Sequence, residues 1–384
     1  MVNAEPLRVI DVDTHISEPP DLWTSRVSKK WGDQVLHVKW DERLNGLAWF
    51  IGDERIAAAP SVAMAGWKLP PPSNPPTYED AHPGAYDAVE RLKLMDEEGI
   101  YAHLLYPNVG GFGSGRFLKL KDPALMLESV RAYNDFAVDW SVPGKGRLVP
   151  LCVLPFWDVE ESVKELRRAA NLGHKGVIFT SQPHVFDQPM LADPHWNPIF
   201  ATAQELQLPV NFHIGSADLS VLNGYKGNGR QANFAKGSVA LFLDNAHAVM
   251  EIIFGGLCSR FPDLKFVSVE SGIGWVPFLL EAMDWQFLGS DVRSERPDLD
   301  LLPSEYFRRQ IYACFWFEDT APRRLLDVIG YKNVLFETDF PHPTSLYPPQ
   351  TVIEHLESCM EGQPEHVRRA VLHDNAAELY HLDF

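Results

Sequence analysis

Eight short apolar segments alternate with amphipathic helical segments along the whole chain, and this alternation limits the fold more than any other feature. Such alternation is typical of a parallel α/β protein. Eight strand–helix units over 384 residues favour a single (β/α)8 TIM barrel over an open, doubly wound sheet. The predicted strands cover residues 7–15, 101–107, 148–154, 176–180, 209–214, 265–270, 310–314 and 334–339.

One long segment interrupts this alternation. Residues 16–85 are too long for an ordinary loop between a strand and a helix, and they are rich in proline, with LPPPSNPP near their end. Within them, LAWFIGDERIAA predicts a hairpin that turns at Gly52 and Asp53. We therefore predict one domain, residues 1–384, in which residues 16–85 form an insertion over the barrel mouth.

Charge and composition narrow the class of partner. The formal net charge is -18, and the clustered Lys and Arg that neutralise nucleic-acid phosphates are absent. The N-terminus, MVNAEPLRV, has no basic region followed by an apolar core, and no run of about 18 apolar residues predicts a membrane span. The four cysteines are widely spaced without a CxxC motif, which predicts reduced thiols. We expect a soluble cytoplasmic protein that acts on a small molecule and binds neither nucleic acid nor membrane.

Acids and histidines stand at the carboxyl ends of four predicted strands, and these ends meet at one mouth in a parallel barrel. A lone strand-end Asp is usually a turn former, and a lone buried His usually belongs to the core. Four such ends together predict a metal site built from nitrogen and oxygen donors. The donors are Asp13 and His15 on the first strand, His213 on the fifth, Glu270 on the sixth, Asp339 on the eighth, and His342 just after it.

The number of metal ions stays open at this level. The histidines and carboxylates exceed what one tetrahedral zinc uses, so one or two divalent ions (Zn, Mn or Fe) fit the set. For one ion the expected ligands are Asp13, His15, His213 and Asp339, and Glu270 or Asp339 would bridge to a second ion. Asp11, two residues before Asp13, is interpreted as a structural residue or a hydrogen-bond partner of the ligands deeper in the strand, and as a metal ligand only in second place.

Other residues are candidates for contact with a substrate. The loop GGFGSGR after the second strand lacks the GKS/T of a phosphate loop, so we interpret it as a mouth loop in which Arg116 binds a substrate carboxylate. A second loop, NGYKGNGR, ends in Arg230, a weaker candidate of the same kind. Trp275 and Trp316 follow the sixth and seventh strands and either wall the pocket or simply pack. His247 is by default a core or surface histidine, with a role as a metal ligand or a partner of one as the alternative.

These motifs together resemble a known family. IDVDTH at the first strand, NFHIG at the fifth, TDFPH at the eighth and NAAELY near the end are similar to the amidohydrolase superfamily, in the branch of 2-amino-3-carboxymuconate-6-semialdehyde decarboxylase and the resorcylate-type decarboxylases. The resemblance implies a zinc or manganese ion held by Asp13, His15, His213 and Asp339. It also implies a homo-oligomer, and it leaves a heteromer with a homologous subunit open.

Two residues depart from the pattern of that branch. The first-strand pair is often HxH or ExH there, whereas this chain has Asp13 in the first position. A carboxylate is a harder ligand than an imidazole, so Asp13 favours manganese or iron over zinc. After the sixth strand the decarboxylases carry a histidine that is thought to act in proton transfer, and this chain has Glu270 in VESGIGW. A carboxylate can serve as a general base, but at neutral pH it is a poor proton donor unless its pKa is raised.

Three functions are compatible with this set of residues. The first is metal-assisted hydrolysis or C–C lyase (decarboxylase-like) chemistry on a small polar, carboxylate-bearing substrate, with Asp339 moving a proton and His342 orienting the substrate or leaving group. The second is a dinuclear iron or manganese monooxygenase, similar to hydroxylases of the 2-aminoisobutyrate type, which Glu270 favours. The third is a catalytically silent structural subunit, which the complete ligand set disfavours.

Overall fold

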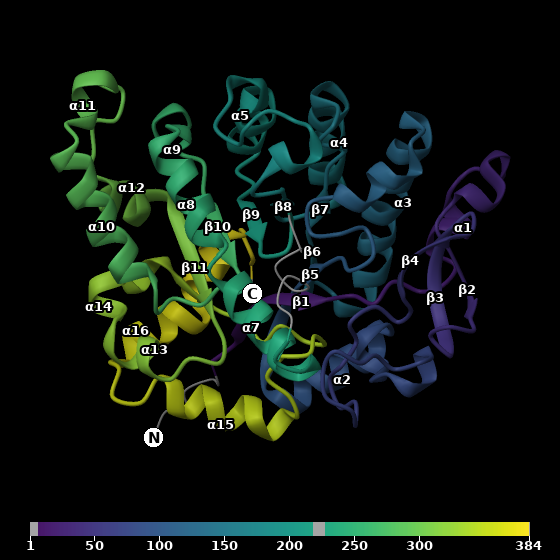
Figure 1. The fold of residues 1–384 in the computed structure, drawn as a ribbon. Helices are drawn as coiled ribbons and strands as arrows, with labels where there is room; N and C mark the ends of the chain where they lie inside the picture. The colour runs from purple at the N-terminus through teal and green to yellow at the C-terminus, as the bar shows by residue number, and fades with distance from the viewer. Residues whose placement is uncertain (1–6, 218–226, 384) are drawn as a thin grey trace.

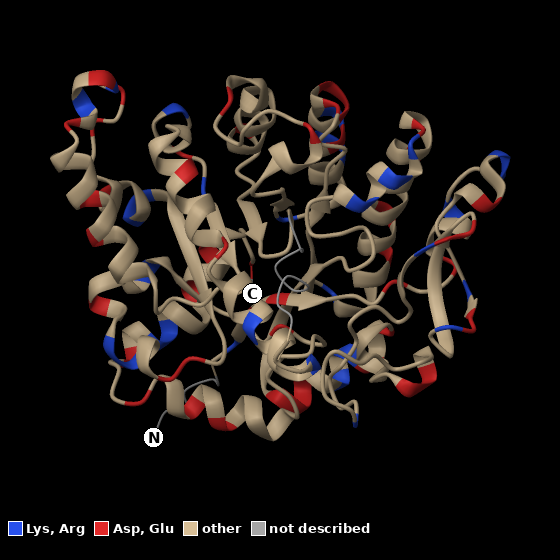
Figure 2. Cartoon of the chain, viewed as in Figure 1, with Lys and Arg blue, Asp and Glu red and all other residues tan. Residues whose placement is uncertain are grey.

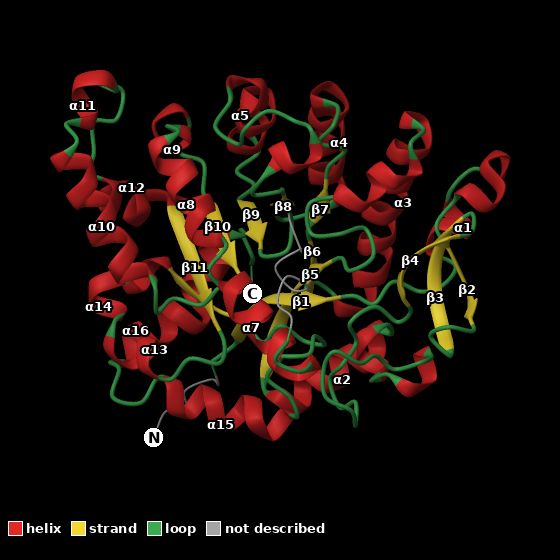
Figure 3. Ribbon diagram, viewed as in Figure 1, coloured by secondary structure: helices red, strands yellow, loops and turns green. Residues whose placement is uncertain are grey.

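Parallel strands occupy the middle of the molecule and helices surround them (Figure 1, Figure 3). The computed structural model describes residues 7–217 and 227–383, so the first half of the predicted loop NGYKGNGR, residues 223–226, lies outside the described residues. All eight predicted strands are present; their ends lie within two residues of those expected, except that the eighth ends three residues early, and the third is split in two at Leu151. They are β1 (Val9–His15), β5 (Ile100–Tyr106), β6 (Leu148–Pro150), β7 (Cys152–Val153), β8 (Val177–Ile178), β9 (Val210–His213), β10 (Phe266–Val269), β11 (Ile311–Phe315) and β12 (Val334–Phe336).

The strands pair in the order expected for a barrel, but the regular pairing does not run all the way round. One parallel sheet has the order β1-β5-β6 and the other β12-β11-β10-β9-β8-β7. Between β12 and β1 the contact is a single parallel bridge, Thr14 to Phe340, flanked by hydrogen bonds from Asp339 N to Asp13 O (3.0 Å) and from His15 N to Phe340 O (2.7 Å). The expected α/β fold is therefore present, whereas the expected single closed barrel is replaced by two parallel sheets with a weakly paired junction between β1 and β12.

The helices begin and end where local chemistry allows. Asp87, Asp122 and Asp158 each accept hydrogen bonds from backbone N–H groups at the start of a helix, and Gly99 ends α2 with a left-handed φ of 73°. The helices are α1 (Leu22–Arg26), α2 (Ala88–Glu98), α3 (Pro123–Ser141), α4 (Val159–Leu172), α5 (Asn197–Glu205), α7 (Arg230–Phe242), α8 (Asn245–Phe254), α9 (Leu257–Arg260), α10 (Val276–Gly289), α11 (Val292–Glu295), α12 (Pro303–Gln310), α13 (Thr320–Arg324), α14 (Leu326–Ile329), α15 (Pro349–Cys359), α16 (Glu365–Arg369) and α17 (Asn375–Leu379).

The insertion after β1 contains a small antiparallel sheet at one edge of the molecule (Figure 3). Its strands are β2 (His37–Asp41), β3 (Gly46–Ile51) and β4 (Glu54–Ala58), and β3 and β4 form the predicted hairpin around Gly52 and Asp53. The proline-rich stretch then returns to the carboxyl ends of the parallel strands, where Pro71 and Pro72 line a cavity. The insertion thus contributes directly to the surroundings of the strand ends.

The outer helices carry acidic and basic residues side by side (Figure 2). Among the described residues, one helical stretch, Arg230–Phe254, is long and apolar enough to cross a membrane by length and composition alone. It consists of α7 and α8, and the inner face of α8 places Val249, Ile252 and Ile253 in the core. Burial accounts for part of its apolar character, because 39% of its most apolar window is buried.

Candidate metal centre

Six buried donors from four strands meet at the carboxyl end of the parallel strands. They form two overlapping groups of four, and within each group the donor atoms lie within 4.8 Å of one another. The groups share His15 and Glu270. The first group is Asp13, His15, His213 and Glu270, and the second is His15, Glu270, Asp339 and His342. Every residue predicted from the sequence as a principal metal ligand is therefore part of one cluster.

The two strand-end histidines direct nitrogen lone pairs at the same point. Nδ1 of His15 lies 3.1 Å from Pro107 O, and Nδ1 of His213 lies 2.7 Å from Ile214 O. A carbonyl oxygen only accepts, so each Nδ1 must carry its proton and each neutral ring has a lone pair on Nε2. The two Nε2 atoms are 3.1 Å apart. Such an arrangement repels unless a cation or a proton lies between the rings.

His342 also directs a nitrogen lone pair into the cluster, in this case from Nδ1. The Asn108 amide donates from Nδ2 to Ile16 O, which turns its Oδ1 towards His342 Nε2 at 2.8 Å. Nε2 must then carry the proton, and the lone pair of Nδ1 faces Asp339 Oδ1 at 2.7 Å. Burial lowers the pKa of His342 to about 3, so the ring is neutral near pH 7. A third imidazole nitrogen is therefore free to bind a cation.

The carboxylates of the cluster lack the donors that buried carboxylates normally have. Both Oδ atoms of Asp13 and Oδ1 of Asp339 are buried without a hydrogen-bond donor. His213 Nε2 lies 3.4 Å from Asp13 Oδ2 and 3.2 Å from Glu270 Oε2, and His15 Nε2 lies 3.3 Å from Asp13 Oδ1. These oxygens and nitrogens surround one position that a positive charge would satisfy.

The pKa values of the cluster are shifted in the directions expected when no positive charge lies between its carboxylates. Burial, followed by the neighbouring Asp339 and Asp13, raises the pKa of Glu270 well above its usual range. Burial also raises the pKa of Asp339 to about 6. Burial opposes protonation of His213, but Asp13 beside it raises its pKa above the ordinary value. Without a cation the cluster retains protons in its place.

The backbone holds two of these ligands in an unfavourable conformation. Glu270 and Asp339 have φ values of 56° and 62°, in the left-handed region that ordinary residues seldom adopt. Glu337 Oε2 accepts the backbone N–H of Glu270 at 3.2 Å. Asp11 accepts from Asp13 N at 3.0 Å and from Thr338 N and Oγ1 at 3.1 and 2.5 Å. Backbone strain supported by such contacts is typical of functional sites.

Glu337 is a member of this region that the sequence reasoning missed. It is fully buried, its Oε1 has no hydrogen-bond partner, and burial followed by Asp13 raises its pKa well above the usual range. The sequence held a signal for it, because Glu337 precedes Asp339 by two residues in the same way that Asp11 precedes Asp13. Side chains two apart on a strand lie on the same side.

A cavity of about 240 Å³ opens onto the cluster. Glu270 and His342 form its inner end, and Arg116 lines its wall beside Asn108. Much of the remaining wall is apolar, and it comes from the insertion, the loop after β5, the residue after β9 and α7: Val62, Pro71, Pro72, Phe112, Ile214, Phe234, Leu241 and Phe242. The Phe112 ring also packs against the His213 ring with centroids 4.0 Å apart. A small molecule with an apolar body and one anionic group fits this lining.

The remaining predicted contact residues lie around this cavity rather than in its lining. Arg230 is exposed and donates to Pro72 O of the insertion. Trp316 is buried and packs edge-on against Phe242, and Trp275 is half-buried with its indole N–H on Ser271 O. Trp316 thus supports the wall from behind through Phe242.

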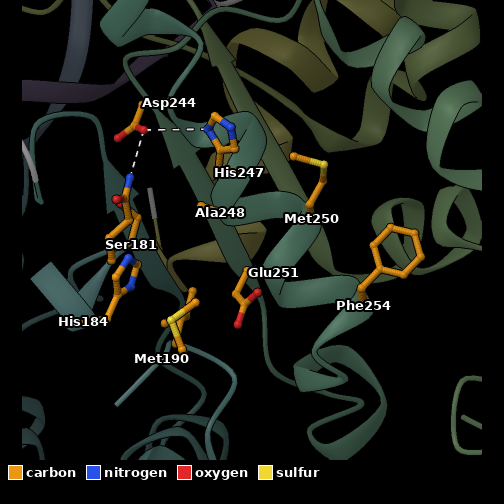
Figure 4. A pocket seen from close by; sticks show the side chains of 11 residues that line it. Ser181, His184, Met190, Asp244, His247, Ala248, Met250, Glu251 and Phe254 are labelled. Carbon is orange, nitrogen blue, oxygen red and sulfur yellow. Dashed lines mark hydrogen bonds and ion pairs between the residues drawn. The ribbon is translucent and has the colours of Figure 1, made fainter. Parts of the chain in front are cut away.

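His247 lies apart from the metal-ligand cluster. It is on α8, its side chain is 73% exposed, and its Nδ1 is 3.9 Å from Asp244 Oδ1. It lines a separate surface cavity of about 620 Å³ between α8 and the segment after β8, together with His184, Met190, Glu251 and Phe254 (Figure 4). The structure therefore does not bring His247 to the other candidate ligands.

The residues present fit one or two divalent cations. The donors are imidazole nitrogens and carboxylate oxygens without sulfur, which suits manganese, iron or zinc. Asp13, His15 and His213 lie in the first group and Asp339 in the second, so the four ligands expected for one ion do not fall within a single group. Glu270 or Asp339 would complete one site, and His342 would add a donor for a second.

Comparisons with known proteins agree with this site. The amidohydrolase family model matches residues 10–382. The chain belongs to the amidohydrolase family. The predicted resemblance is thereby confirmed, and the relatives fall in the decarboxylase branch that the motifs indicated.

Three relatives show how similar known proteins are to this chain in sequence and in fold. The 2-amino-3-carboxymuconate-6-semialdehyde decarboxylase of Dictyostelium discoideum is 26% identical over 268 residues, 68% of either chain. A crystal structure of an amidohydrolase from Mycobacterium avium subsp. paratuberculosis K-10 has a TM-score of 0.76 at 24% identity, covering 98% of this chain and 100% of that one. A 5-carboxyvanillate decarboxylase from Novosphingobium aromaticivorans, solved with manganese and a nitrobenzoic acid, has a TM-score of 0.66 at 18% identity, covering 97% and 96%.

Proposed function

We propose that this amidohydrolase is a metal-dependent decarboxylase of a small carboxylate-bearing substrate with an apolar body. The observation that carries the proposal is the convergence of three imidazole lone pairs and three carboxylates at the inner end of a largely apolar cavity whose wall holds Arg116. A decarboxylase relative and decarboxylase folds among the similar structures support this chemistry over hydrolysis.

The chain's own residues supply binding, orientation and a proton. A divalent cation at this site would polarise a bound substrate oxygen. Arg116 binds an anionic group of the substrate, because a guanidinium pairs with carboxylates in two-point geometry. Phe112 and the insertion exclude water from the apolar body. The bond to the departing carboxylate breaks, CO2 leaves, and the electron pair left on carbon takes a proton. Glu270 Oε, in the cavity lining, delivers this proton when the other donors hold a single ion and Glu270 is not a ligand.

The test uses protein reconstituted with manganese, zinc or iron. A panel of hydroxylated aromatic acids and unsaturated dicarboxylic semialdehydes is assayed for CO2 release, with D2O as solvent to detect deuterium in the product. We expect release with at least one metal, and a fall in kcat of roughly 100-fold or more for Glu270→Gln. CO2 release at an unchanged rate in Glu270→Gln contradicts the role of Glu270. A metal-loaded protein that releases no CO2 from any acid of this panel refutes the proposal.

A second candidate function rests on one specific observation, the overlap of two four-donor groups that share His15 and Glu270. This donor set matches two iron or manganese ions, which are suited to O2 activation, so an O2-dependent monooxygenase is the alternative. Metal analysis with electron paramagnetic resonance separates the two functions. One ion per chain without O2 consumption supports the decarboxylase, and two coupled ions with substrate-dependent O2 consumption support the oxygenase.

We also propose a cytoplasmic homo-oligomer. Phe278, Trp285 and Leu288 expose large apolar side chains along α10, a pattern that favours contact with another protein surface. Light scattering of the wild type and of Trp285→Glu tests this: we expect a larger mass for the wild type, and a monomeric wild type refutes it.

A further inference from the structure

The inner face of α2 carries two charged residues where apolar ones are expected. Its buried residues are Ala88, Arg91, Leu94, Met95 and Glu98, the regular spacing of a core-facing stripe. Arg91 is 0% exposed. Burying an arginine is costly unless its donors are satisfied. Its hydrogen-bond partners therefore indicate what this residue does.

The guanidinium of Arg91 joins three segments of the chain. Nη2 donates to His15 O at 2.6 Å, Nη1 to Thr14 Oγ1 at 3.1 Å, and Nε to Gly84 O at the end of the insertion at 2.6 Å. The same group lies over the Phe340 ring, 4.6 Å from its centroid. Thr14 and His15 end β1, and Phe340 directly follows Asp339.

These contacts lie at the junction between β1 and β12, where the described strands form an isolated bridge in place of a regular ladder. Thr14 and Phe340 form only an isolated bridge there. His15 and Asp339 approach each other across this junction, with Nε2 and Oδ1 3.5 Å apart. Two backbone hydrogen bonds, Asp339 N to Asp13 O and His15 N to Phe340 O, join the strands here, and side-chain contacts add to them in keeping the two ligands in place. One such contact is made by the Asp11 carboxylate, which accepts hydrogen bonds from Thr338 N and Oγ1.

We infer that Arg91 is a positioning residue that fixes His15 and Asp339 relative to each other across the β1–β12 junction, so that both can bind the same cation. The inference rests on the metal site of the proposed function but not on the reaction catalysed there. Arg91 touches no part of the cavity and acts only through the backbone of His15, the Thr14 hydroxyl and the Phe340 ring. Among the described residues no carboxylate forms an ion pair with its guanidinium within 4.0 Å. Burial lowers the pKa of Arg91, which Glu98 and Asp11 raise only from a longer distance, so a simple ion pair does not explain its burial.

The experiment measures Mn²⁺ affinity of metal-free protein by competition with a chelator, alongside the melting temperature without metal. The variants are Arg91→Lys, which keeps the charge but loses the planar fork of donors, and Thr14→Val, which removes one acceptor. Losing a residue that orients metal ligands typically weakens metal binding roughly 10- to 100-fold. We expect a loss of that size for Arg91→Lys and a smaller loss for Thr14→Val.

The matched control is Asn333→Ala. Asn333 is buried at the opposite end of β12, where its amide donates to Arg308 O and Ile311 O at 3.1 and 2.9 Å. This variant should lower the melting temperature while leaving Mn²⁺ affinity within about twofold of wild type, because the ligands are not touched. Mn²⁺ affinity of Arg91→Lys equal to wild type overturns the inference, as does an equal loss in Asn333→Ala. A wild type that binds no divalent metal overturns the metal site and this inference with it, whereas a metal-binding protein without decarboxylase activity overturns only the proposed function.

Discussion

A buried histidine far from the metal centre should make the protein sensitive to acid. His174 follows α4, and its Nε2 lies 3.1 Å from Asn134 O. Its Nδ1 is buried without a hydrogen-bond partner. Burial lowers the pKa of His174 from 6.5 to about 4. The unfolded chain therefore takes up a proton at a higher pH than the folded protein, and stability is lost as the pH falls from about 6.5 to about 4.

The size of this effect follows from the two pKa values. Each pKa unit corresponds to about 1.4 kcal/mol, so protonation of His174 alone lowers the free energy of unfolding by about 2 kcal/mol between pH 7.5 and pH 5. His174→Gln removes the titration and keeps an N–H that can reach Asn134 O. We expect the free energy of unfolding of this variant, from urea titrations of metal-free protein, to fall by about 2 kcal/mol less than that of wild type over this range.

The control is His195→Gln, because His195 is exposed. Its free energy of unfolding should depend on pH as that of wild type does. If His174→Gln loses as much stability as wild type between pH 7.5 and pH 5, burial does not lower the pKa of His174 and the reasoning fails.

Three further predictions concern the site. Removing metal with a chelator should lower the melting temperature and Mn²⁺ should restore it, since a ligand at 1,000 times its Kd stabilises by about 4 kcal/mol; a melting temperature indifferent to Mn²⁺ contradicts the site. Arg116→Met should raise KM roughly 10- to 100-fold with little change in kcat, because a charge-assisted hydrogen bond contributes about 1.5–3 kcal/mol, whereas Arg230→Met should change KM less than about threefold. Gly113→Ala should lower both stability, by about 1–3 kcal/mol, and activity. The reason is that a Cβ there would lie 2.8 Å from Thr180 Cβ and displace the loop that holds Phe112 against His213, so unchanged activity would count against Phe112.

Local patterns were sufficient to predict most of the fold. The eight apolar runs and the hairpin at Gly52 and Asp53 are found as expected, because their periodicity and turn residues act over a few neighbours. The division of the strands into two sheets was not predictable. It depends on how β1 meets β12 after more than 300 intervening residues, and no local pattern encodes the register of that junction.

Side chains at the ends of strands were predictable for the same reason as the strands themselves. Asp13, His15, His213, Glu270 and Asp339 follow apolar runs, and parallel strands bring such positions together. Arg91 was not predicted as a functional residue, because α2 has the pattern of an ordinary amphipathic helix. Only the packing of α2 shows that the Arg91 guanidinium lies on the inner face. His247 is polar and metal-capable in sequence, but its position on α8 turns it towards solvent.

The sequence by itself determined the order of elements and the donor types of the site, since both depend on residue identity and short-range spacing. Only the tertiary structure decided which nitrogen of each histidine is free. That choice depends on Pro107 O, Ile214 O and the Asn108 amide, which reach the rings from other segments or from a backbone turn. Hydrogen-bond direction needs coordinates, because a donor and an acceptor must lie within about 3 Å and in line.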